Sequence, residues 1–241
     1  SVGGTLALAA SQGFAAGILD LTAGELGTNG TPEVRAREAV DAAAVLGLAG
    51  RWCAKLPDGG LSALDVSQER VLVGWLRRLR PTILLSHFPK DRHPDHIQAS
   101  QLVERAWYHA GLARYGAHSD ADLEAVAAKP LEPFRPKARY WFASRIGFHP
   151  SMVVDVTTTW ETKRRAILAH KSQVIRDGVH SKATALNDPE FLTRIEARMR
   201  HYGGMIGVKY GEPFTSDMPL GVVDLSAVLG SPKPVPGAFT G

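Results

Sequence analysis

Short apolar runs alternate with longer segments of helical periodicity along most of this chain. Apolar runs bounded by turn residues are typical of buried strands, and they occur at residues 14–22, 51–56, 82–87, 139–144 and 152–156. Apolar residues repeated every three or four positions predict amphipathic helices, and they cover residues 1–12, 32–46, 67–79, 94–112, 160–173 and 189–202. Because helices follow strands in turn, we expect an α/β fold with a doubly wound, mostly parallel sheet flanked by helices.

The remaining segments complete this outline. Residues 116–136 are polar and rich in proline, with one short helical piece, so we expect a surface excursion there. The chain begins with a helix that no strand precedes, which is an unusual start for an α/β protein. We find no internal repeat and expect a single domain over residues 1–230, followed by a Pro/Gly-rich tail over residues 231–241.

Composition and charge narrow the classes of protein. Apolar residues make up 44% and charged residues 22% of the 241 positions, which is ordinary for a globular protein. Cys53 is the only cysteine, which excludes a disulfide framework and a thiolate metal cluster. The net charge of +4 is spread over helix faces and is no nucleic-acid footprint. No apolar run approaches the ~18 residues of a membrane span. We therefore expect a cytoplasmic protein that binds neither nucleic acid nor membrane.

Titratable chemistry is concentrated in the segment 90–96, Lys-Asp-Arg-His-Pro-Asp-His, which follows the strand at 82–87 and opens a helix. Loops after strands are where open α/β sheets bind ligands. His93 and His96 share a helical face and can both meet a metal ion, although a catalytic zinc usually takes three protein ligands. Asp95 is placed to orient one imidazole. The alternative is a solvated helix N-terminus with surface histidines; the position after a strand favours a site.

Other candidates are weaker. His149 lies in a tight turn between two strands and is placed to face the same cleft. Arg35 follows a Gly-rich loop and is either a clamp for a carboxylate or phosphate or an exposed helix arginine. Asp20 and Asp155 end strands and are ligands, orienting groups or caps. Five further histidines are expected on the surface or in packing: His109, His118, His170, His180 and His201.

A collinear series of motifs identifies a likeness to a known family. It comprises Asp20-Leu21-Thr22, Asn29-Gly30-Thr31-Pro32-Glu33-Val34-Arg35, Leu56-Pro57-Asp58, Asp91-Arg92-His93-Pro94-Asp95-His96, Gly147-Phe148-His149 and Ser172-Gln173. This series resembles the LmbE/PIG-L-like metal-dependent deacetylases over about Gly3 to Phe214. Within the family it is most similar to the bacillithiol-pathway subgroup, which acts on N-acetylglucosaminyl-malate.

The resemblance implies a Rossmann-like fold and a hydrolase that uses Zn²⁺ or another divalent metal to remove the acetyl group from an N-acetylglucosamine (GlcNAc) conjugate, a small molecule. It also implies a homo-oligomer. His93 would stabilise the oxyanion or act as an acid, with Asp95 orienting it. Arg35 and Arg92 would hold the malate carboxylates. The implied roles are metal binding for His96, catalysis for His93 and Asp95, and substrate binding for Arg35, Arg92, Asn29, Gly30 and His149.

The chain departs from the family pattern at its N-terminus. Family members carry an Ala-His-Pro-Asp-Asp segment shortly before the position of Gly3, and it supplies two metal ligands and the general base. We therefore expect that the first strand is absent from this chain, that the sequence is cut there, and that the chain binds metal weakly or not at all. The alternatives are a deacetylase or amidase on another GlcNAc conjugate, such as a chitooligosaccharide, and a non-catalytic ligand-binding or assembly protein.

Overall fold

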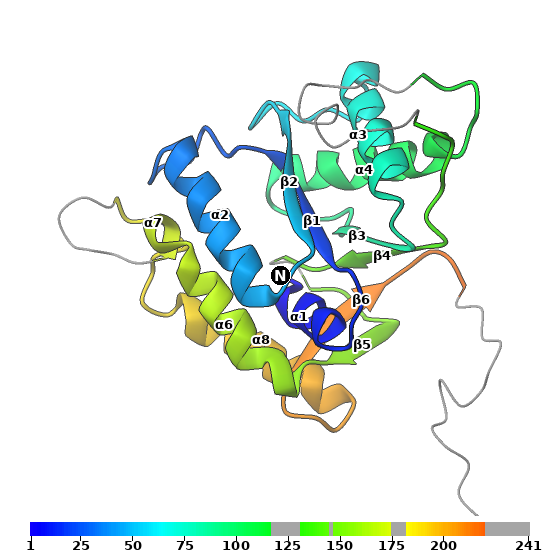
Figure 1. Cartoon of the computed structure of the whole chain (residues 1–241). Helices are drawn as coiled ribbons and strands as arrows, with labels where there is room; N and C mark the ends of the chain where they lie inside the picture. Colours follow the sequence, from blue (N-terminus) through cyan, green and yellow to red (C-terminus); the bar gives the residue numbers. More distant parts are fainter. Residues whose placement is uncertain (117–130, 145–146, 175–181, 220–241) are drawn as a thin grey trace, which may run out of the picture.

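The computed structural model describes residues 1–116, 131–144, 147–174 and 182–219 of the chain (Figure 1). The strands are β1 (Gly17–Thr22), β2 (Gly50–Leu56), β3 (Ile83–His87), β4 (Ala138–Phe142), β5 (Met152–Asp155) and β6 (Gly211–Thr215). The helices are α1 (Gly3–Ser11), α2 (Pro32–Leu46), α3 (Val66–Leu79), α4 (Pro94–Ala110), α6 (Trp160–Ala169), α7 (Lys171–Val174) and α8 (Phe191–Met205), with a 3-10 turn at Thr157–Thr159. The expected helical piece at 121–128, the extended segment at 221–224 and the C-terminal tail lie outside the described residues.

The strands form two sheets, a parallel pair of β1 and β2 and a mixed sheet in the order β3-β4-β6-β5. β1 pairs with β2 in parallel, and β3 pairs with β4 in parallel. β6 runs antiparallel between β4 and β5. The expected α/β class with parallel strands between helices is confirmed, and the antiparallel part is confined to β6 and its two neighbours. Within the described ranges, β1 pairs only with β2 and β3 only with β4.

Helices pack against both sheets (Figure 1). α3 packs with α4, and α2 packs with α6. The larger core lies under α3 and α4 and includes Trp75 and Leu102, which are almost fully buried. A smaller core under α1, α2 and α6 includes Ala42 and Ala166. This packing leaves the carboxyl end of β3 and the start of α4 at the surface.

Local chemistry explains the bounds of α2. The Thr31 hydroxyl accepts a hydrogen bond from the Val34 amide at 3.3 Å, and Pro32 occupies the first turn. Gly47 ends the helix with φ of +69°, a conformation that favours glycine. The predicted helix over 32–46 is confirmed at both ends. The helix predicted over 160–173 instead breaks at His170, whose ψ of 61° is not helical, so that α6 and α7 are separate.

A buried ion pair joins α1, α6 and β6. Lys163 Nζ lies 2.7 Å from Glu212 Oε1, and the two side chains are 3% and 1% exposed. Glu212 also accepts hydrogen bonds from the amides of Gly4 at 2.9 Å and Thr5 at 2.7 Å. A Cβ on Gly4 would lie 2.8 Å from Val156 Cβ and 3.0 Å from the Glu212 carboxylate. Gly4 thus allows close packing at the start of α1.

A second buried carboxylate, Glu69, joins α3 to α4. Its side chain is fully buried and accepts hydrogen bonds from Arg105 Nε at 2.8 Å and the Tyr115 hydroxyl at 2.7 Å. His109 Nδ1 also contacts this carboxylate, and the His109 ring stacks on Tyr115. His109 therefore has a packing role, as expected for it from the sequence.

Candidate functional site

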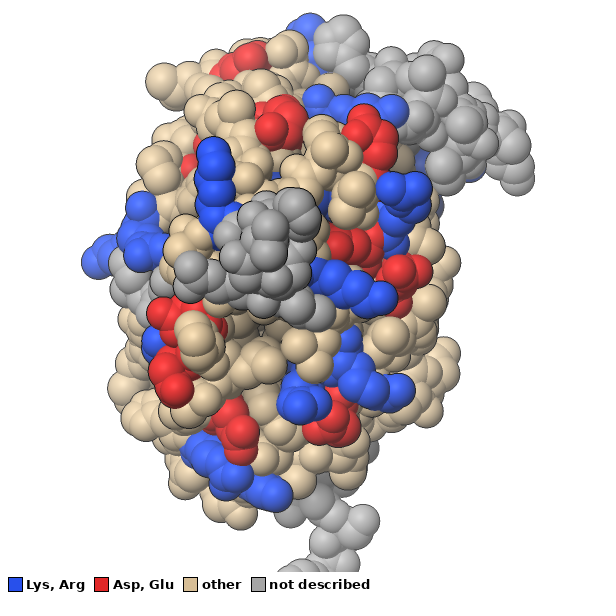
Figure 2. Space-filling view, turned by 90° about the vertical axis from the view of Figure 1, so that its left-hand side faces the viewer, with Lys and Arg blue, Asp and Glu red and all other residues tan. Residues whose placement is uncertain are grey.

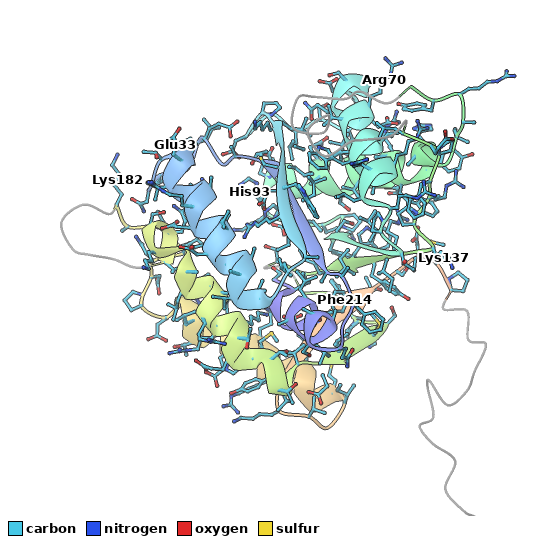
Figure 3. All side chains as sticks on the ribbon, in the orientation of Figure 1. Glu33, Arg70, His93, Lys137, Lys182 and Phe214 are labelled. Atoms are coloured by element: carbon cyan, nitrogen blue, oxygen red, sulfur yellow. The ribbon has the colours of Figure 1, made fainter. Side chains whose placement is uncertain are left out.

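The candidate site lies where β3 ends and α4 begins. β3 ends at His87, and His93 is the N-cap residue of α4, which places the intervening segment at the carboxyl end of a parallel strand. Pro94 occupies the first turn of α4, a position in which its missing N–H costs nothing. Figure 3 labels His93 and so marks the site in the molecule.

Three imidazoles form a column at this place. The rings of His93 and His96 stack with centroids 4.7 Å apart, and those of His96 and His87 with centroids 4.1 Å apart. Phe142 of β4 closes the column against His87 at 4.8 Å. His93 is exposed, whereas His96 and His87 are partly enclosed. Sequence reasoning missed His87, although its place at the end of a strand that precedes the motif was a usable signal.

The electrostatics of the column keep its inner ring neutral. Burial, with the nearby His96 ring adding to it, lowers the pKa of His87 to about 3, so His87 is uncharged at neutral pH. Burial alone would raise the pKa of Asp91, but the hydrogen bond from the His93 amide at 3.0 Å and the nearby His96 ring outweigh it, and the pKa is lowered. Asp91 Oδ2 lies 3.2 Å from His96 Nδ1. Asp91 thus lies at ion-pair distance from Nδ1 of His96, the place from which a carboxylate can orient an imidazole whose other nitrogen binds a ligand.

Asp95 makes a different contact from the one expected. It is 7% exposed, and its Oδ2 accepts a hydrogen bond from the Gly59 amide at 2.7 Å. Within the described part of the chain, no hydrogen bond or ion pair joins the Asp95 carboxylate to the His93 ring. The carboxylate that orients an imidazole of the column is Asp91, on His96.

Arg35 points into the Gly-rich loop that precedes α2. Its guanidinium donates a hydrogen bond to the Gly24 carbonyl. A Cβ on Gly24 or on Gly27 would overlap that guanidinium, so these two glycines make room for it. Arg92, by contrast, is exposed directly beside His93. The structure therefore leaves Arg92 exposed next to His93 in the chain and places Arg35 among backbone groups.

Asn29 and Gly30 tie the same loop to the segments around Ser172 and Lys182. The Asn29 amide group donates to the Lys182 carbonyl and accepts from the Lys182 amide, both at 2.9 Å. Gly30 has φ of +75°, and a Cβ on it would lie 2.5 Å from Ser172 Oγ. His149 is exposed, and its neighbour Phe148 packs on Phe88 at 4.7 Å. This contact brings the 147–149 turn near the end of β3, but no contact of the His149 ring with the column is found within the described ranges.

The residues of the site do not by themselves form a complete metal centre. A catalytic zinc site takes three protein ligands and one open position. The described ranges contain no group of three or more His, Cys, Asp or Glu side chains arranged to hold a metal ion. His96, oriented by Asp91, has the chemistry of one zinc ligand. The described donor set therefore does not fit a catalytic zinc ion on its own.

Other surface features do not compete with this site. An open hollow of about 500 Å³ lies along Trp160 and Tyr210, and a second of about 490 Å³ lies between α1 and α2. No histidine lines either hollow. Figure 2 shows Lys and Arg side chains interspersed with Asp and Glu on the face that it presents. Among the described residues, no helix combines the length and apolarity needed to cross a bilayer.

Comparison with known proteins finds one matching family model and several relatives. The model described as PIG-L: GlcNAc-PI de-N-acetylase matches residues 1–107, which include the segment 90–96. A solved structure, that of a conserved protein from Thermus thermophilus, is 35% identical in sequence with a TM-score of 0.78. That similarity covers 92% of this chain and 90% of the other.

Two curated relatives carry names of enzymes. A diacetylchitobiose deacetylase of Thermococcus kodakarensis is 32% identical over 155 residues, which are 61% of this chain and 49% of that protein. A 4-oxalmesaconate hydratase of Pseudomonas putida is 28% identical over 183 residues, which are 68% of this chain and 65% of that protein. The matched region thus spans between about half and two thirds of the length of these relatives.

Proposed function

Because residues 1–107 match the PIG-L family model, we propose that this chain is a member of the PIG-L (LmbE) family and that it removes the acetyl group from an N-acetylglucosamine conjugate by hydrolysis of the amide bond. The observation that carries the proposal is the His93–His96–His87 column, with Asp91 holding His96, at the carboxyl end of β3. Imidazoles at such a position can donate to a developing oxyanion and transfer protons near neutral pH.

The residues of the site take distinct roles in this proposal. His93 is the exposed ring of the column and reaches the substrate as an oxyanion donor or as the acid that protonates the leaving amine. His96, held by Asp91, is the metal ligand of the motif. Asn29, Gly30 and His149 are proposed to contact the substrate.

No chemical step is assigned to a metal ion, because the described donor set is incomplete. We expect the chain of residues 1–241 to bind zinc weakly, well below one ion per molecule after dialysis, as measured by elemental analysis. Substitution of His96 by Ala should reduce the bound zinc further, whereas substitution of the exposed His201 should not. Stoichiometric zinc that depends on His96 would instead show that further ligands lie outside the described residues.

The finer substrate proposal is N-acetylglucosaminyl-malate, as in bacillithiol biosynthesis. Its support is the exposed guanidinium of Arg92 beside His93, since a guanidinium binds a carboxylate in bidentate fashion. Arg35 uses one of its donors on Gly24 and has others left for the second carboxylate. A homo-oligomeric, cytoplasmic enzyme is part of the same proposal.

The alternative substrate is a chitooligosaccharide. The similarity to a diacetylchitobiose deacetylase favours it, because that relative is 32% identical over the matched region. An uncharged oligosaccharide has no carboxylate for the guanidinium of Arg92 to bind. The role of Arg92 therefore separates the two substrates.

Release of free amine from each substrate tests the proposal. His93→Gln should lower kcat by about 10²- to 10³-fold, the usual effect of losing an oxyanion donor, and His201→Gln is the matched control. Arg92→Ala should raise KM for N-acetylglucosaminyl-malate by about tenfold or more and leave KM for diacetylchitobiose unchanged. The control is Arg37→Ala, which removes an exposed guanidinium from α2. Amine release from neither substrate, with or without added zinc, contradicts the deacetylase proposal.

A further inference from the structure

A buried carboxylate on α2 binds the short helix α7. Glu38 is 7% exposed, and it accepts hydrogen bonds from the Ser172 amide at 2.6 Å and from the Ser172 hydroxyl at 2.8 Å. The two bonds use both carboxylate oxygens, Oε1 for the amide and Oε2 for the hydroxyl. A carboxylate buried to this extent needs such partners. The two donors therefore satisfy Glu38, and they join α2 to a residue 134 positions away in the chain.

The same contact continues from α7 into the Gly-rich loop that precedes α2. The Gln173 side-chain amide donates to the Asn29 carbonyl, and also to Ser172 Oγ at 3.1 Å. Gly30 lies against Ser172, because a Cβ on Gly30 would be 2.5 Å from Ser172 Oγ. The Asn29 side chain in turn accepts a hydrogen bond from the Lys182 amide at 2.9 Å. A connected set of hydrogen bonds thus runs from α2 through α7 and the loop to Lys182.

The two helices that meet here differ in what holds them. α7 has four residues, and the backbone before it is non-helical at His170, with ψ of 61°. A single helical turn is not stable by itself in water, so α7 depends on contacts with its surroundings. α2 has 15 residues and a capped start, and Glu38 lies in its second turn. α2 is therefore the fixed support in this contact, and α7 with the loop is the part that is held.

We infer that Glu38 is a positioning residue, which holds α7 against Asn29 and Gly30 as a hydrogen-bond acceptor for Ser172. The effect on substrate rests on the proposed function, in which Asn29 and Gly30 contact the substrate; the effect on α7 and the loop does not. The competing role for Glu38 is that of a negative charge, for which the geometry of the acceptor is immaterial. Two hydrogen bonds from one residue, each to a different carboxylate oxygen, favour the positioning role.

Two substitutions of Glu38 separate these roles. Glu38→Gln keeps an oxygen that can accept from the Ser172 amide, and its NH₂ group can donate to the Ser172 hydroxyl oxygen, but the negative charge is gone. Glu38→Ala removes both the charge and the acceptor. A positioning residue should tolerate the first change better than the second, whereas a role that depends on charge should be lost equally in both variants.

Hydrogen exchange of single amides, followed by NMR on the intact chain, tests the inference without any enzyme assay. In Glu38→Ala, exchange of the Ser172 amide should become about tenfold faster or more, because a bond to a charged group is lost. Exchange of the Lys182 amide, which reports on Asn29, should become about fivefold faster. In Glu38→Gln both amides should stay within about twofold of the parent. The control is Asp41→Ala, which removes an exposed carboxylate from α2 and should change neither amide.

Ser172→Ala gives an independent test should Glu38→Ala fail to fold. It removes the hydroxyl that donates to Glu38 and accepts from Gln173. Exchange of the Lys182 amide should therefore become about threefold faster or more. Ser151→Ala, at an exposed serine, is the matched control and should leave that amide unchanged.

Enzyme kinetics add a readout that a loss of stability alone would not change. Glu38→Ala should raise KM for N-acetylglucosaminyl-malate more than it lowers kcat, and Glu38→Gln should keep KM near the parent value. Unchanged exchange at Ser172 and Lys182 in Glu38→Ala overturns the inference, and so does equally fast exchange in Glu38→Gln, which assigns the role to the charge. If Glu38→Ala does not fold, an unchanged Lys182 amide in Ser172→Ala overturns it. Faster exchange in the variants with no amine release from the parent chain supports the inference and contradicts the proposed function.

Discussion

The carboxylates of two loops that hydrogen-bond to each other are held differently from those of the core. We call these the rim loops: residues 24–27 after β1 and residues 57–60 after β2. Glu25 and Asp58 accept hydrogen bonds from backbone amides near the surface. Glu212 and Glu69 are 1% and 0% exposed and face charged side chains, the ammonium of Lys163 and the guanidinium of Arg105. A backbone amide needs only an acceptor, but a buried cation needs a negative charge. Charge should therefore matter for stability in the core and hydrogen-bond geometry should matter at the rim.

The largest expected effect comes from breaking the buried pair. Lys163→Met should lower the free energy of unfolding by about 3–5 kcal/mol, because it leaves Glu212 charged and buried without a cation. Denaturant titration measures it. The double variant Lys163→Met/Glu212→Gln is the matched control and should recover part of the loss. A cost below about 1 kcal/mol for the single variant would show that the amides of Gly4 and Thr5 suffice for Glu212.

Acid should lower the free energy of unfolding through the buried carboxylates of the core. Burial would raise the pKa of Glu212, but Lys163 outweighs it and the pKa is lowered; for Glu69, likewise, the hydrogen bonds outweigh burial. A carboxyl group whose folded pKa is depressed stabilises the fold above its unfolded pKa, about 4.5 here, and this stability is lost as the pH falls through the folded pKa.

Unfolding titrations between pH 7 and pH 3 check this prediction. The free energy of unfolding should decrease as the pH drops below about 4.5. The slope should be shallower in the Lys163→Met/Glu212→Gln variant, which has lost the Glu212 carboxyl. Identical slopes in the two proteins would mean that Glu212 binds its proton equally well in the folded and unfolded states.

How much of the fold and of the site could be predicted from the sequence depends on how far apart in the chain the two partners of each contact lie. The ends of α2 follow from neighbouring residues, and the bounds 32–46 are confirmed. The place of the motif at the end of β3 follows from the strand–helix order. The contact of Glu212 with Gly4 joins positions 208 residues apart, and that of Asp95 with Gly59 spans 36 residues. Local pattern carries no signal for such pairs, so the sequence does not predict that Asp95 meets the Gly59 amide.

A single hydrogen bond to a core carboxylate should have an intermediate effect. Tyr115→Phe removes the hydroxyl that donates to Glu69 at 2.7 Å and keeps the ring that stacks on His109. The free energy of unfolding should fall by about 1–2 kcal/mol, because the charged Glu69 loses one hydrogen-bond donor. The loss should be no larger, because Arg105 still pairs with Glu69. Tyr140→Phe is the control, since its hydroxyl has no hydrogen-bond partner among the described residues. An equal loss in both variants would mean that Glu69 does not depend on this donor.

The smallest expected effect completes the comparison at the rim. Glu25→Gln keeps an oxygen that can accept from the Asp58 amide, so the free energy of unfolding should change by less than about 0.5 kcal/mol. The same exchange at Glu69, Glu69→Gln, should cost more, because Arg105 would lose its buried counter-charge. Denaturant titrations of the two variants under one condition measure the difference. If Glu25→Gln costs as much as Glu69→Gln, charge rather than hydrogen-bond geometry holds the rim loops, and the distinction between rim and core does not stand.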